Sequence, residues 1–165
     1  AASTPLLTKF LDKKKLLMFL MGAVAVLSIC FYFVPTDQIW LIFTIHAAIG
    51  LCLGPKSPLV FSMYADTADY SEYKTGRRAT AMIFSAAAFS QKLGGAVAGA
   101  MIGWTLGALG YVANQAQTSG SEQGILLLMT VVPAIFAALA VFVVRFYTLD
   151  EAQMKTLHAA LKYDQ

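Results

Sequence analysis

Four long apolar blocks, separated by short polar segments, constrain this chain more than any other feature. The blocks cover residues 16–34, 39–64, 79–109 and 125–147. Each reaches the roughly 20 residues that a helix needs to cross a hydrocarbon core of about 30 Å. The sequence therefore predicts an all-α membrane protein with four transmembrane helices.

Composition excludes a soluble domain. The chain is 58% hydrophobic and only 13% charged, whereas soluble domains contain about 25% charged residues. The first block is no secretory signal, since a polar and basic stretch precedes it and three further blocks follow. The sequence has no metal-ligand cluster, no nucleophile paired with a base and no phosphate-binding glycine loop. It therefore predicts neither an enzyme nor a metal or cofactor site.

The basic residues alternate between loops. Ten of the 12 Lys and Arg lie in three segments, whereas the loops at residues 35–38 and 110–124 have none. By the positive-inside rule, residues 1–15, the middle loop and the C-terminal end are cytoplasmic. A bacterial inner membrane is the expected location, and this topology argues against nucleic acid as a partner. The ten residues are Lys9, Lys13, Lys14, Lys15, Lys74, Arg77, Arg78, Arg145, Lys155 and Lys162.

Two blocks contain informative helix-breaking or small residues. Gly54, Pro55 and Pro58 interrupt the second block and predict a kink that faces protein or a cavity. In the third block, four glycines recur every fourth residue, which predicts close packing against another helix. The alternative is that glycine is simply common in membrane helices. These glycines are Gly95, Gly99, Gly103 and Gly107.

The tail at residues 148–165 is predicted to form a short amphipathic cytoplasmic helix. Thr148 and Glu151 fit a capping box, and Leu149, Met154, Leu157 and Leu161 share one face. The helix would lie on the membrane surface or on the bundle. A solvated, frayed tail is the alternative.

Lys92 is a charge placed deep in the third block, with Gln91 beside it. It lies about 18 Å along the helix from Thr80, near the middle of the bilayer. A lysine there costs about 2.5 to 3.5 kcal/mol and usually marks an ion or substrate pathway. The alternative is a structural ion pair with a helix outside this chain.

Three acids and three bases follow one another at the inner end of the second block. The acids recur every three residues, so their carboxylates share one face if the helix continues. Such a cluster can form ion pairs that break and remake as a transporter opens and closes. A solvated loop would explain the bases but not the acids. The six residues are Asp66, Asp69, Glu72, Lys74, Arg77 and Arg78.

Two further residues of the second block could carry function. Lys56, next to Pro55, could attract an acidic sugar, although snorkelling toward the cytoplasm is the alternative. His46 could relay protons or could simply pack through a hydrogen bond.

Two segments closely resemble the signature of the glycoside/pentoside/hexuronide:cation symporter family, which includes melibiose permease and belongs to the major facilitator superfamily. They are MYADTADYSEYKTGRRAT and FSAAAFSQKLGGAVAGAMIGW, and the ending FYTLDEAQMKTLHAALK extends the match. The resemblance implies a fold of twelve helices, of which this chain supplies the ninth to twelfth. It also implies sugar symport coupled to Na⁺ or H⁺ by alternating access.

The resemblance assigns roles to individual residues. It implies a cytoplasmic gating network of Asp66, Asp69, Glu72, Arg77 and Arg78, and places Lys92 near the sugar and cation sites. The family's principal cation-binding acids lie in an N-terminal half that has no counterpart here. Together with a first residue that is Ala rather than Met, this indicates a fragment. A stand-alone four-helix membrane protein, acting as an oligomer or scaffold, is the rival hypothesis, and neither the sugar nor the cation follows from the sequence.

Overall fold

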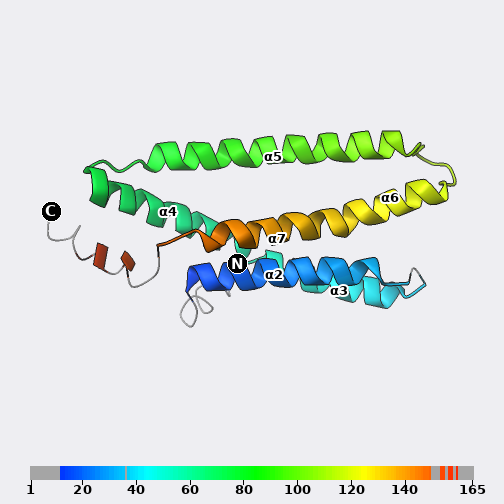
Figure 1. Ribbon diagram of the computed structural model, residues 1–165, viewed down its shortest axis with the longest axis horizontal. Helices are drawn as coiled ribbons and strands as arrows, with labels where there is room; N and C mark the ends of the chain where they lie inside the picture. The colour runs from blue at the N-terminus through cyan, green and yellow to red at the C-terminus, as the bar shows by residue number, and fades with distance from the viewer. Residues whose placement is uncertain (1–11, 36, 150–152, 155, 158, 160–165) are drawn as a thin grey trace.

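The computed structural model describes residues 12–35, 37–149, 153, 154, 156, 157 and 159. All regular structure in these ranges is helical, and the long helices run roughly parallel to one another in a single elongated bundle (Figure 1). The helices are α2 (Lys13–Tyr32), α3 (Ile39–Leu53), α4 (Lys56–Thr75), α5 (Thr80–Ala108), α6 (Ser119–Met129) and α7 (Val131–Arg145).

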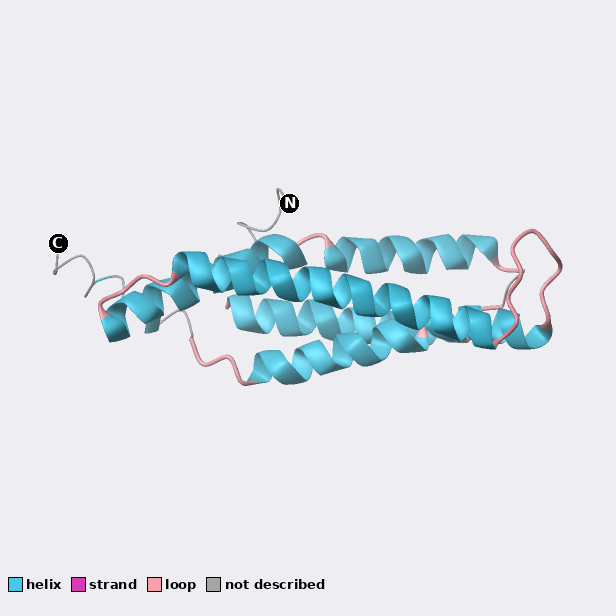
Figure 2. Cartoon of the chain, turned by 90° about the horizontal axis from the view of Figure 1, so that it is seen from above, coloured by secondary structure: helices cyan, strands magenta, loops and turns pink. Residues whose placement is uncertain are grey.

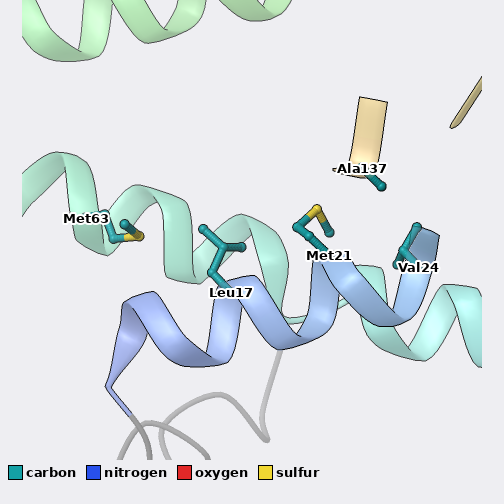
Figure 3. Close-up of a cluster of buried hydrophobic side chains, with 5 residues drawn as sticks. All are labelled: Leu17, Met21, Val24, Met63 and Ala137. Atoms are coloured by element: carbon teal, nitrogen blue, oxygen red, sulfur yellow. The ribbon is translucent and has the colours of Figure 1, made fainter. Parts of the chain in front are cut away.

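The core forms where α2 packs against α7 and α4. Leu17, Met21 and Val24 repeat at helical spacing along α2 and meet Met63 of α4 and Ala137 of α7 (Figure 3). All five are buried. The first predicted span is therefore confirmed as a helix, and it begins three residues earlier than the apolar block because Lys13 to Lys15 are helical too.

The predicted kink in the second span is confirmed. Helix α3 ends at Leu53, and α4 starts at Lys56, after Gly54 and Pro55. Pro55 has no N–H for the carbonyl four residues earlier, so the helical ladder is interrupted there. The two helices together form a 37-residue apolar segment. Helix α4 ends at Thr75, beyond the predicted end of this span at residue 64. The two helices together are therefore roughly 55 Å long, which exceeds the thickness of a hydrocarbon core.

Helix α5 matches the third predicted span and stands apart from the core. It touches α4 through Phe84, whose ring lies 6.1 Å from those of Phe61 and Tyr64. At its other end, the Ser121 hydroxyl of α6 donates to the Leu109 carbonyl. No residue of α5 is buried. Most of the surface of α5 therefore makes no contact with the rest of the described chain.

The fourth predicted span is present as two helices joined at Thr130. Pro133 lacks the N–H that would pair with the carbonyl of residue 129, which accounts for the break. The helix also begins at Ser119 rather than 125, because the Thr118 side chain accepts a hydrogen bond from the Ser121 N–H and caps it. Glu122 in the first turn adds a favourable interaction with the helix dipole.

Among the described residues, three helical segments are both long and apolar enough to cross a membrane. They are α2, α3 with α4, and α6 with α7. Helix α5 has 29 residues, which is ample length. It is rich in Gly and Ala rather than large apolar side chains and contains Gln91 and Lys92, so its hydropathy is lower. The protein is an all-α, multi-pass membrane protein.

The ends of the helices fall into two groups. The start of α2 and the ends of α4 and α7 lie at one end of the bundle, where Lys13 contacts Asp66 and Lys14 contacts the carbonyl of Arg145. The connections after α2 and after α5 lie at the other end (Figure 2). The segments that are rich in basic residues therefore lie at one end of the bundle, and the loops without basic residues lie at the other, as the positive-inside rule predicts.

Little of the predicted amphipathic tail falls among the described residues. Met154 and Leu157 are buried, with 6% of each exposed, whereas Gln153 and Thr156 are exposed. Leu157 and Thr156 share a cavity with Tyr70 and Tyr73 of α4. This part of the tail therefore lies on the bundle. The remaining tail residues, and residues 1–11 of the predicted N-terminal loop, lie outside the described ranges.

Candidate functional site

The gating network predicted at the end of α4 is brought together in part. Helix α4 continues to Thr75, so Asp66, Asp69 and Glu72 share one face. The Arg78 guanidinium lies 2.6 Å from Asp69 Oδ1, and its Nε lies 3.6 Å from Glu72 Oε2. One arginine thus joins two carboxylates.

Gly76 makes this geometry available. It ends α4 with φ of +67°, a left-handed conformation that favours glycine, and its N–H donates to the Glu72 carbonyl at 2.8 Å. The chain reverses there, which returns Arg78 over the preceding helical turn. Substituting a β-branched residue for Gly76 would strain this reversal.

Asp66 has a different partner from the one the sequence indicates. Lys13 Nζ donates to Asp66 Oδ2 at 2.7 Å and to Oδ1 at 3.0 Å. Only 7% of Asp66 is exposed. Sequence reasoning counted Lys13 only as a loop cation, since no local pattern relates two residues 53 positions apart.

Arg77 lies outside the network. It is exposed, and its side chain makes no ion pair with the described residues. Its backbone carbonyl accepts from Ser71 Oγ at 3.3 Å and Thr75 Oγ1 at 3.4 Å. The five residues of the predicted network therefore separate into an Arg78 cluster, the Asp66–Lys13 pair and an unpaired Arg77.

Two neighbours complete this end of the bundle. Lys14 Nζ donates to the carbonyls of Arg145 at 2.9 Å and Tyr147 at 2.6 Å, where it ties the end of α7 to the start of α2. Lysine at a helix C-terminus also interacts favourably with the helix dipole. Burial raises the pKa of Tyr147, two residues beyond α7, to about 12, and the nearby Asp66 carboxylate adds to this effect. The Tyr147 phenol is therefore neutral at physiological pH.

A second candidate site is a cavity of about 290 Å³ between α2, α4, α5 and α7. Its polar lining consists of Lys56, Ser57 and Tyr64 from α4 and Gln91 from α5. Ser57 and Tyr64 are seven positions apart and therefore lie on one face of α4, and Lys56 lines the cavity beside them. Leu17 and Met21 of α2 form part of the apolar wall of the cavity. Two of the predicted substrate residues, Lys56 and Gln91, thus meet at one cavity.

Lys92 and the glycine row face elsewhere. Lys92 is exposed, does not line this cavity and makes no ion pair within the described ranges. Neighbouring residues on a helix point about 100° apart, which separates Lys92 from Gln91. A Cβ added at any glycine of the row would meet nothing within 4 Å. The row is Gly95, Gly99, Gly103 and Gly107.

No cluster of three or more His, Cys, Asp or Glu suited to a metal ion occurs among the described residues. His46 packs edge-on against Phe31, with ring centroids 4.8 Å apart. This contact is between two rings and is not a hydrogen bond, so the proton relay and the hydrogen-bonded packing both stay predictions.

The fold is that of a polytopic helical membrane protein with paired charges at one end of the bundle, and comparison with known proteins identifies its family. Residues 2–151 match the family model described as MFS/sugar transport protein. The chain belongs to this family, and its relatives include proteins named as symporters and sugar transporters.

Three relatives illustrate the match. The chain is 37% identical to the uncharacterized symporter YnaJ of Bacillus subtilis, over 93% of this chain and 33% of that protein. It is 38% identical to the inner membrane symporter YicJ of Escherichia coli, over 81% and 29%. It is 29% identical to the putative glycoside/cation symporter YagG of Escherichia coli, over 96% and 35%. The chain therefore spans about a third of the length of these relatives. No solved structure matches it.

Proposed function

We propose that the chain is the C-terminal part of a secondary active transporter that imports a glycoside, pentoside or hexuronide together with Na⁺ or H⁺. The family is that of sugar transporters, and a relative is named a glycoside/cation symporter. The observation that carries the proposal is the open cavity between α2, α4, α5 and α7, which has four polar side chains in a mainly apolar lining. Sugar sites in such transporters lie between helices near the bilayer midplane.

The residues of the cavity suit sugar recognition. Gln91 offers two donors and an acceptor, and Ser57 and Tyr64 each offer a hydroxyl. Sugar hydroxyls need both donors and acceptors, and apolar walls suit the faces of a sugar ring. In this proposal, Lys92 lies next to the substrate residue Gln91 and serves as the countercharge to a coupling carboxylate.

The coupling carboxylate would come from outside the described chain. Lys92 is exposed on α5, and the glycine row beside it has open space on its surface. The first eight of twelve helices, packed in part on this face of α5, would supply both the acids and the close helix contacts. The present helices would then be the ninth to twelfth.

Gating is assigned to the charges at the end of α4. Asp69, Glu72 and Arg78 form one cluster, and Asp66 is tied to Lys13. Alternating access requires interactions at one end that form in one state and break in another. The positive-inside rule places this end in the cytoplasm of a bacterial inner membrane, and YicJ carries the name of an inner membrane symporter.

The test is transport by the complete transporter in proteoliposomes, with an Na⁺ gradient or a pH gradient imposed separately. Uptake of labelled methyl glycosides against a concentration gradient under one of the two would support the proposal. Absence of gradient-driven uptake for a panel of hexosides, pentosides and uronides would contradict it. A stand-alone scaffold would give that negative result and would form oligomers through α5.

A further inference from the structure

Lys56 occupies an unusual place for a cation. It is the first residue of α4, immediately after the Gly54–Pro55 break. It lies about 25 Å from Ile39 along the helix axes and about 28 Å from Thr75. An ammonium in the middle of a membrane segment is unfavourable and usually faces a protein interior or a cavity.

No described carboxylate is available to neutralise Lys56. Asp66 is the nearest acid along α4, but it is ten residues, or about 15 Å, further and is bound by Lys13. A lysine side chain, with a stem of four carbons, cannot extend over that distance. Snorkelling to the charged end of α4 is excluded for the same reason. The described acids all lie toward the ends of the bundle: Asp12, Asp66, Asp69 and Glu72 at one, Asp37 and Glu122 at the other.

The Lys56 side chain instead lines the cavity, where the polar groups beside it are neutral and each can donate a hydrogen bond. Ser57, Tyr64 and Gln91 share the cavity, and none of its described lining residues is acidic. An ionised carboxylate accepts hydrogen bonds at about four sites and binds a cation through charge-assisted bonds. The cavity thus combines one unpaired positive charge with several neutral donors.

The size of the cavity suits one sugar unit. Its volume of about 290 Å³ is close to the lower limit of roughly 300 Å³ for small-molecule sites. Val60 and Phe61 of α4 add apolar side chains to the lining. A neutral sugar would leave the Lys56 ammonium unpaired, whereas an acidic sugar would neutralise it.

We propose that Lys56 makes this transporter selective for a sugar with an acidic group, a carboxylate or sulfonate, which binds in the cavity beside Ser57 and Gln91. The inference rests on the proposed function and adds the charge of the substrate to it. Lys56 then contacts the acidic group directly, and the donors of Ser57, Tyr64 and Gln91 hold the remaining oxygens and the ring hydroxyls.

The experiment measures uptake by the complete transporter in proteoliposomes under imposed Na⁺ and pH gradients. Its probes are matched pairs that differ only at carbon 6: methyl glucoside with methyl glucuronide, methyl galactoside with methyl galacturonide, and each neutral glycoside with its 6-sulfonate. For one or more pairs, the acidic member should enter at least about tenfold faster. The carboxylate and sulfonate arms show which of the two acidic groups is the natural one.

Three variants isolate the role of the ammonium. Lys56→Gln should lower uptake of the acidic probe roughly 10- to 100-fold, as expected for the loss of a charge-assisted bond. Lys56→Arg should retain most of the preference. Lys15→Gln, which removes an exposed lysine at the start of α2 outside this cavity, should leave the preference unchanged. The ratio of acidic to neutral uptake within one preparation does not depend on how much protein folds.

The outcomes are distinct. Faster uptake of the neutral member in every pair, or an unchanged ratio in Lys56→Gln, would overturn the assignment while the proposed function stands. Uptake of no probe under either gradient would contradict the proposed function itself, and the assignment would fall with it.

Discussion

The Lys13 ammonium lies 2.7 Å from the Asp66 carboxylate, although 53 residues separate them in the chain. This pair ties the first turn of α2 to the middle of α4. The carboxylate side chain is 10% exposed and the lysine side chain 34% exposed. The carboxylate therefore depends on Lys13 far more than the lysine depends on the carboxylate, because water can solvate only the lysine well.

Removing Lys13 should destabilise this end of the bundle. Breaking a fully buried pair costs about 3 to 5 kcal/mol. Since Lys13 is partly exposed, we expect Lys13→Ala to lower stability by about 1 to 3 kcal/mol. The measurement is thermal unfolding of the purified complete transporter. Lys15→Ala is the matched control, because Lys15 reaches Asp12 only at 3.6 Å and is 73% exposed.

The exchanged pair, Lys13→Asp with Asp66→Lys, tests the interaction itself. It should recover part of the stability that either single change removes, as coupled residues do in a double-mutant cycle. A double variant no more stable than the sum of the two single losses would mean that the contact is incidental.

The two neighbouring arginines should behave differently. Arg78 contacts both Asp69 and Glu72, whereas Arg77 makes no ion pair with described residues. An exposed ion pair contributes about 0 to 1 kcal/mol to stability, so the thermal stability of Arg78→Ala should be close to that of the parent protein. Its effect should appear in transport, because 1.4 kcal/mol of bias between two states is a tenfold change in their ratio. We expect uptake to fall severalfold in Arg78→Ala and little in Arg77→Ala; equal effects would contradict a gating role specific to Arg78.

Local rules account for what the sequence could predict. The break before Lys56 follows from Pro55, whose missing N–H interrupts a helix in any context. The start of α6 at Ser119 could not be found by hydropathy, since its first turn is polar and is fixed by the Thr118 cap. A search for Ser or Thr caps before the apolar block, rather than for the block alone, would have found it.

Contacts between distant helices account for what the sequence could not predict. The Lys13–Asp66 pair joins α2 to α4, and the cavity joins Lys56 of α4 to Gln91 of α5. Each residue carries a signal of its own, a charge or an amide within an apolar segment. Their meeting depends on how α2, α4, α5 and α7 pack, which no spacing along the chain encodes.

The glycine row provides a test of what covers α5. A side chain at Gly99 would meet no described atom within 4 Å. Gly99→Leu should therefore leave the packing of this chain intact and disturb only its contact with another helix. In the complete transporter we expect lower thermal stability and lower uptake, while Ala100→Leu, one position round the helix, has a smaller effect. Equal tolerance at both positions would show that no helix packs closely on the row.

Orientation can be tested with single cysteines in a transporter from which Cys30 and Cys52 have been removed. Ser119 lies at the start of α6, at the end of the bundle away from the basic residues, and Ser71 lies near the end of α4. By the positive-inside rule, a cysteine at 119 should react with an impermeant thiol reagent added outside intact cells, and one at 71 should not. Reaction of both after permeabilisation is the control, and the reverse pattern in intact cells would invert the assigned topology.

Lys92 provides the sharpest separation between a transport role and a structural one. Its ammonium lies about 18 Å along α5 from Thr80, and no described residue forms an ion pair with it. If it serves coupling, Lys92→Ala should abolish or severely weaken gradient-driven uptake in the complete transporter, with normal amounts of protein in the membrane. If it only pairs with a buried carboxylate, the same change should leave that carboxylate alone and lower thermal stability by about 3 to 5 kcal/mol. Uptake and unfolding, measured on one preparation, distinguish the two. Normal uptake with normal stability would contradict both roles and move the coupling charge wholly to the remaining helices of the transporter.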